Sequence, residues 1–177
     1  WYSLDTPEGP MEPIRASKAC TIGLIFATYT SRTEKIVDLT PKGMSKYIAF
    51  SSSWTKKYQV KTEKARARYE QQLTQNLIEN AKAKGFTIMS LPNDQVWSSG
   101  LLQDISSSVL AKKAREFNCD ILICVTTRAP TDSKMTKFET SSKILDARSE
   151  KFRKDFFVSE PQNIAYKIMN SKIVPSE

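Results

Sequence analysis

Cysteine is the residue type in this sequence most able to do chemistry, and two of the three cysteines stand close together. Cys119 and Cys124 bracket the run CDILIC, and Cys20 lies in another apolar run. Their spacing is not the CxxC spacing of a metal site. On one strand an odd spacing points the two side chains to opposite faces, whereas a disulfide needs Cβ atoms about 4 Å apart. We therefore expect cysteines that pack in the core, with a reactive thiol or a disulfide to Cys20 as alternatives.

Other catalytic groups are sparse in the sequence. The chain has no histidine, which is the commonest general base and metal ligand. It has five glycines and neither GxxxxGK[ST] nor GxGxxG, so no phosphate-cradling loop is predicted. Acids are scattered over predicted strand ends and turns: Asp120, Asp132, Asp146 and Asp155. We expect no catalytic residue, metal or cofactor; the alternative is a small enzyme with a crevice where strands end, near 28–32, 91–93 and 126–128.

Basic and aromatic residues gather in one stretch of the chain. The basic members are Lys56, Lys57, Lys61, Lys64, Arg66 and Arg68, and Trp54, Tyr58 and Tyr69 lie between them. The candidates for partner binding are Trp54, Lys56, Lys57, Tyr58, Arg66 and, farther along the chain, Trp97. Aromatic residues and arginine are enriched in protein interfaces, and a net charge of +8 favours an acidic partner. The same composition suits single-stranded nucleic acid, and a solvated helix face is the third interpretation.

The elements that must position these residues follow from hydrophobic periodicity and from Gly and Pro punctuation. Strands are predicted at 18–29, 86–91 and 119–128, and a hairpin at 134–147 and 151–159. Helices are predicted at 62–85, at 93–118 and from Pro161, with Thr62 as an N-cap and Gly85 as a C-cap. In the hairpin, the residues expected to point inward are Phe138, Ile144, Phe152 and Phe156.

This order, β-α-β-α-β-β-β-α, predicts an α/β (α+β) fold with a mixed sheet of about five strands and helices packed on it. The first three strands should run parallel, and the last two should return as an antiparallel hairpin. Residues 1–17 are interpreted as an extended tether, 18–172 as a single domain and 173–177 as a tail. Within the domain, 30–61 is interpreted as an irregular insertion with a short strand at 46–54.

The ordered elements resemble a known family over about 140 residues, from KACTIGLIF to FRKDFFVSE. The stretches that carry the resemblance are LTQNLIENAKAKGFTIMSL, AKKAREFNCDILICVTTR and TSSKILDARSEKFRKDFF. Together they look like the α/β domain of the TolB amino-terminal type. Its relatives include the outer-membrane lipoproteins that activate penicillin-binding proteins and the curli secretion lipoprotein.

The resemblance implies a non-enzymatic protein-docking domain of the bacterial cell envelope. Such a domain is a periplasmic or outer-membrane lipoprotein component of a secretion, motility or cell-wall assembly. Its partners would be other envelope proteins or further copies of itself, and it would touch the membrane only through a lipidated amino terminus. Trp54 or Trp97 would serve as the aromatic anchor, and basic residues would steer an acidic partner. The alternative is a cytoplasmic nucleic-acid-binding α/β domain.

Overall fold

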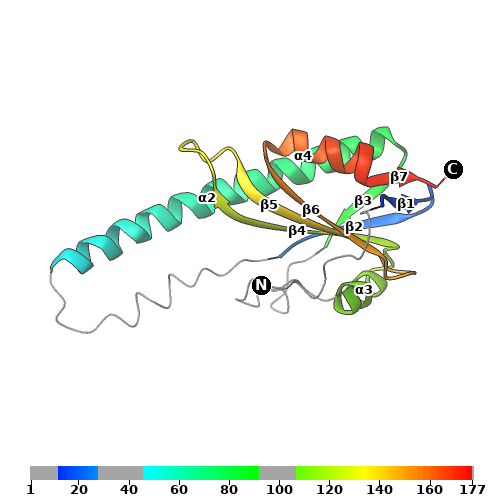
Figure 1. Ribbon diagram of the computed structural model, residues 1–177, viewed down its shortest axis with the longest axis horizontal. Coiled ribbons are helices and arrows are strands. Elements are labelled where there is room, and N and C mark those ends of the chain that lie inside the picture. The colour runs from blue at the N-terminus through cyan, green and yellow to red at the C-terminus, as the bar shows by residue number, and fades with distance from the viewer. Residues whose placement is uncertain (1–11, 28–45, 92–106, 177) are drawn as a thin grey trace.

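The computed structural model describes residues 12–27, 46–91 and 107–176, and of residues 46–59 it describes only the side chain of Lys57. Five strands form a mixed sheet in the order β3-β2-β4-β5-β6 (Figure 1). Their bounds are Thr21–Ala27 (β2), Thr87–Ser90 (β3), Ile121–Pro130 (β4), Phe138–Asp146 (β5) and Phe152–Ser159 (β6). β2 pairs in parallel with β3 and β4, whereas β4, β5 and β6 are antiparallel neighbours. The predicted mixed sheet and C-terminal hairpin are confirmed.

Helices cover both faces of this sheet. α2 (Lys46–Ala83) and α4 (Pro161–Lys167), which continues as the π-helical turn η2 (Ile168–Lys172), lie on one face, and α3 (Ser107–Glu116) lies on the other (Figure 1). β4 is therefore buried on both faces, and it reads as a continuous apolar run from Ile121 to Val125. Ile121, Ile123 and Val125 pack in the core on the α2 face. Leu122 and Cys124 pack in the smaller core on the α3 face.

Two glycines have specific structural tasks. Gly85 has a φ of 82° and ends α2 as predicted, and the Phe86 N–H donates to the Ala81 carbonyl at 2.8 Å. Gly23 lies in β2, where a Cβ would stand 3.0 Å from the Sγ of Cys119 and from a methyl of Leu122. A Cβ here would require these side chains to shift by a few tenths of an ångström, so the glycine lets the α3-side core pack closely on β2.

Helix α2 begins at Lys46, sixteen positions before the predicted start at 62. The irregular insertion therefore does not include 46–61, the short strand at 46–54 is wrong, and Thr62 is an interior helical residue instead of an N-cap. The three serines at 51–53 indicated a turn, but serine costs only about 0.5 kcal/mol of helix propensity relative to alanine. No Gly or Pro interrupts the sequence between Lys46 and Ala83. Residues 28–45 lie outside the described residues.

The two ends of the domain are joined by a short second sheet. β1 (Ile14–Ala16) pairs in parallel with β7 (Ile173–Pro175). Ile14, Ala16 and Ile173 are all buried in the core on the α2 face. The last residues of the predicted tether and the first residues of the predicted tail are thus strands, because each contributes apolar side chains that the core needs.

The hairpin β5–β6 has one inward residue that the sequence pattern misassigned. Phe138 and Ile144 are fully buried as predicted, and Phe152 packs at the edge of the α3-side core. Phe156 is 59% exposed, whereas its neighbour Phe157 is buried. Adjacent residues of a strand point to opposite faces, so only one member of the FF pair can enter the α2-side core. The register pairs Phe157 with Thr140, whose side chain meets α2, and that register selects Phe157.

Candidate functional site

The surface with the most distinctive chemistry lies on α2. The helix has 38 residues, and its amino-terminal part extends past the end of the sheet (Figure 1). We call residues 46–61 the arm; at 1.5 Å per residue they span about 24 Å. From Lys46 to Arg68 the helix carries one acid, Glu63, and seven basic residues: Lys46, Lys56, Lys57, Lys61, Lys64, Arg66 and Arg68. Within the part of α2 whose side chains are described, the exposed cations are concentrated at the junction of arm and sheet.

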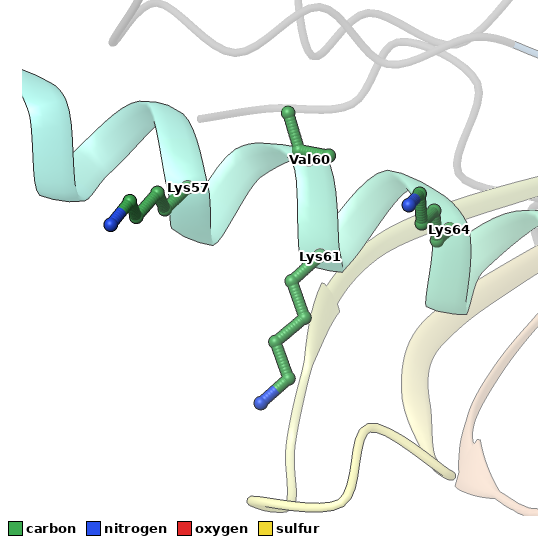
Figure 2. A pocket seen from close by; sticks show the side chains of 4 residues that line it. All are labelled: Lys57, Val60, Lys61 and Lys64. Carbon is green, nitrogen blue, oxygen red and sulfur yellow. The ribbon is translucent and has the colours of Figure 1, made fainter.

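Four of these cations form a continuous exposed row, which we call the basic ridge: Lys57, Lys61, Lys64 and Arg68. The spacing of three or four residues places them on one side of the helix, one per turn. Val60 lies on the same side and is 56% exposed. Figure 2 shows Lys57, Val60, Lys61 and Lys64 around a surface hollow of about 410 Å³ that they line. The lining of the hollow is mainly apolar, as expected for lysine stems and valine methyls, and three of its four lining side chains end in an ammonium group.

The other predicted partner-binding residues fall in different places. Trp54, Lys56 and Tyr58 belong to the arm, where the described structure covers the backbone but not these side chains. Trp97 lies outside the described residues. The ridge therefore includes one of the predicted residues, Lys57. Val60 was not singled out by the sequence, although its position one turn from Lys57 and Lys64 is the signal that could have identified it.

Arg66 faces the sheet instead of the ridge. Its Nη2 donates to the Arg128 carbonyl at 2.6 Å, and its Nη1 forms an ion pair with Glu63. The guanidinium carbon lies 5.9 Å from the centroid of the Phe138 ring, and the side chain is 17% exposed. These contacts fix α2 to the ends of β4 and β5. They leave Arg66 less free to meet a partner than the ridge residues.

A buried polar cluster continues from Arg66 along α2. The Thr127 hydroxyl donates to the Glu70 carboxylate at 2.7 Å, and burial raises the Glu70 pKa above its ordinary value. The Tyr69 hydroxyl donates to the Ser159 carbonyl at 2.9 Å and lies 3.1 Å from the Thr140 hydroxyl. Burial likewise raises the Tyr69 pKa. The sequence pattern did not predict this cluster; its signal is an acid, Glu70, four residues after Arg66 and beside the apolar stripe of the helix.

All three cysteines are free and buried, as predicted. Their arrangement corrects one expectation: Cys119 and Cys124 pack in the same core, on the α3 face, and not on opposite faces of one strand. The reason is that β4 begins at Ile121, so Cys119 lies in the turn after α3, where Asn118 has a φ of 56°. Burial and the nearby Asp120 charge raise the pKa of the Cys119 thiol, which disfavours the nucleophilic thiolate. Among the described residues, no His, Cys, Asp and Glu side chains gather as a metal site would require.

The fold and this surface together describe a mixed α/β domain with a long, basic, partly projecting helix. No family model and no curated protein matches the chain. Among solved structures it is similar to the PelC dodecamer from Paraburkholderia phytofirmans in space group P6, with 9% identity and a TM-score of 0.39, over 89% of this chain and 87% of that chain. A PelC variant dodecamer from the same organism in space group C2 has the same identity and TM-score, over 89% and 88% of the two chains. A likeness at this TM-score does not identify a function. In the described part of the chain, no helix has the length and hydropathy needed to cross a bilayer.

Proposed function

We propose that this chain is a non-enzymatic protein-docking domain of the bacterial cell envelope, and that the basic ridge of α2 binds an acidic surface of another envelope protein. The observation that carries the proposal is the ridge itself. Lys57, Lys61, Lys64 and Arg68 are all exposed on one side of a helix that reaches past the sheet. A row of like charges this regular attracts a partner of opposite charge.

Electrostatics would set the rate and choice of partner more than the affinity. An exposed ion pair contributes about 0–1 kcal/mol, and salt at about 0.1 M screens charges beyond about 10 Å. Four aligned cations accelerate the encounter with an acidic surface and disfavour basic ones. α2 has no acid in its first turn, so the partial positive charge of the helix amino terminus adds to the field of the arm. Affinity then has to come from apolar contact, for which Val60 is the described candidate.

The chemistry of the buried groups supports a non-enzymatic role. The thiol of Cys119 has a raised pKa and is enclosed by the α3-side core. Burial raises the pKa of Glu70, but its carboxylate accepts a hydrogen bond from the Thr127 hydroxyl where α2 meets β4. A catalytic acid or nucleophile must reach a substrate, whereas these groups serve packing.

The ridge proposal is tested by charge reversal. The triple variant K57E/K61E/K64E should bind labelled poly-L-glutamate, a probe for an acidic protein surface, at least about tenfold more weakly than the wild type in fluorescence anisotropy. The matched control K82E/K84E/K112E makes the same charge change at exposed positions away from the ridge. It should stay within about twofold of the wild type, because charges beyond a Debye length are screened. Equal loss in both triple variants would contradict the proposal, since it would show a response to net charge alone.

The location in the envelope rests on the family resemblance and has its own test. Fractionation of the native cells, with an antibody against this domain, should find the chain in periplasmic or outer-membrane fractions. Recovery in the cytosol would refute that part of the proposal and would favour the second candidate.

The second candidate is binding of single-stranded nucleic acid, which the same ridge favours because cations at every turn can contact successive phosphates. It predicts that a labelled oligothymidylate binds, and that the logarithm of the association constant falls linearly with the logarithm of the salt concentration. Absence of binding at low salt would remove this candidate.

A further inference from the structure

We propose that the partner segment that docks on the ridge is an acidic amphipathic helix, which lies along α2 and seats an apolar side chain against Val60. This inference rests on the proposed function and specifies the partner's chemistry. The described residues that line the hollow are at positions 57, 60, 61 and 64. That spacing of three, four and seven residues is the one with which two helices pack side by side.

The shape of the hollow favours a passing segment over an enclosed small molecule. In the described part of the chain, its four lining residues all come from consecutive turns of α2, and Figure 2 shows them along that helix. Small-molecule sites enclose most of the ligand and draw on several elements. A helix laid against α2 needs only one such surface, with an apolar centre and a polar rim.

The charges have the period of a helix. Successive ridge residues, at 57, 61, 64 and 68, are separated by about 4.5–6 Å along the axis, given a rise of about 1.5 Å per residue. Glutamates at the same intervals on a neighbouring helix have the same rise, so each cation can meet one carboxylate without distortion of either helix. Interhelical pairs of this kind choose the partner and its register in coiled coils.

Charge also excludes one occupant, a second copy of this helix. Two copies of α2 side by side would bring together two segments that each have seven basic residues and one acid from Lys46 to Arg68. Like charges across an interface disfavour the pairing. The helix that fits is therefore acidic and belongs to a different chain.

The test compares two peptides of identical composition with the intact domain. The first is an acidic peptide about three heptads long, with leucine at a and d and glutamate at e and g, so that it forms an amphipathic helix. The second has the same residues in an order that forms no apolar stripe. Fluorescence anisotropy should show that the first peptide binds at least about tenfold more tightly. Equal binding of both peptides would overturn the inference, and retained binding of poly-L-glutamate would show that the proposed function still stands.

A second part of the experiment tests the apolar contact at Val60. Val60→Ala should weaken binding of the amphipathic peptide by about threefold or more, because a leucine of the peptide loses its apolar contact with the valine. The matched control is Val158→Ala, at a valine that is 49% exposed on edge strand β6, and it should change nothing. Unchanged binding by the Val60 variant would overturn the inference. Failure of both peptides and of poly-L-glutamate would overturn the inference and the proposed function together. The oligothymidylate could instead bind more tightly than either peptide and lose that binding in K57E/K61E/K64E. This result would overturn the inference and identify nucleic acid as the ligand of the ridge.

Discussion

Cys119 illustrates how burial decides chemistry for single residues in this protein. Its Sγ lies 3.6 Å from the Phe117 carbonyl and would stand 3.0 Å from a Cβ added to Gly23. Cysteine at such a place behaves as a small hydrophobic residue. Its position beside Asp120 in the sequence suggests a reactive site, but the side chain is only 3% exposed and packs in the α3-side core.

The thiols provide the first prediction at this scale. In the native protein at pH 8, Cys20, Cys119 and Cys124 should react with Ellman's reagent far more slowly than after unfolding in urea, by about a hundredfold or more, because each is buried. The absorbance of the released thiolate measures both rates. One cysteine that reacts rapidly in the folded state would show an accessible nucleophile and would reopen the enzyme hypothesis.

Glu70 provides the second prediction at the residue scale. Burial raises its pKa above the ordinary value of 4.5. The folded state then binds a proton more tightly than the unfolded state, so this group's contribution to stability is full below about pH 4.5 and declines as the pH rises through the raised pKa. Glu70→Gln stays neutral and keeps an acceptor for Thr127.

Urea unfolding of wild type and Glu70→Gln from pH 4 to 7 measures the effect. The free energy of unfolding of the variant, relative to the wild type, should rise with pH over this range. The Thr127→Val variant serves as a comparison, because it removes the hydrogen bond and keeps the carboxylate. A difference between Glu70→Gln and wild type that is constant with pH would contradict the raised pKa.

At the scale of elements, α2 has two roles in different parts of its sequence: one part packs on the sheet, and the other carries the exposed positive charge. From Arg66 to Ala81 one side of the helix is buried on the sheet, through Tyr69, Leu73 and Leu77. The arm, at residues 46–61, precedes this stretch, and the ridge runs from the arm to Arg68. The tertiary packing seen among the described side chains of α2 therefore lies in its carboxyl half, and the arm continues the helix that this half nucleates.

This division predicts how a substitution in the arm behaves. Trp54→Ala should leave the urea midpoint of the domain unchanged, because the described side chains of α2 that are buried on the sheet begin at Thr62. The same variant should weaken binding of the acidic amphipathic peptide by about tenfold, as expected for loss of an aromatic anchor. Circular dichroism and anisotropy measure the two quantities. A large loss of stability would instead assign Trp54 to the core.

At the scale of the whole molecule, two strands from near opposite ends of the sequence pair with each other. β1 and β7 come from opposite ends of the sequence, pair in parallel and place Ile14 and Ile173 in the core that α2 covers. The Ser176 N–H also donates to the Ala16 carbonyl at 3.0 Å. Residues 14–16 and 173–175 thus belong to the same folding unit as the sheet and α2.

Removal of residues 173–177 should therefore destabilise the entire domain. The loss includes a fully buried isoleucine and the pairing of β1, which together predict a decrease of about 3–5 kcal/mol in the free energy of unfolding. The control is Val158→Ala, at a valine of β6 that is 49% exposed, and it should change the urea midpoint little. An unchanged free energy of unfolding after removal of 173–177 would refute a stabilising role of the β1–β7 pair.

Much of the architecture followed from local pattern. The apolar run at 121–125, the stripe of Tyr69, Leu73 and Leu77, and Gly85 after the helix predicted β4, the packed half of α2 and its end, because burial and capping select these residue types locally. The start of α2 did not follow, since serine is compatible with both a turn and a helix. The β1–β7 pair did not follow either, because its partners lie far apart in the sequence.

For the candidate site, the sequence by itself determined the concentration of positive charge at 56–68 and the absence of a catalytic signature. Only the tertiary structure decided which of those cations face outward: Lys57, Lys61, Lys64 and Arg68 form the ridge, whereas Arg66 turns to the Arg128 carbonyl and Phe138. It also decided that Phe157 and not Phe156 enters the core. The physical reason is the same in each case: composition and local propensity are properties of neighbouring residues, but the direction in which a side chain is buried depends on which distant strand or helix packs against it.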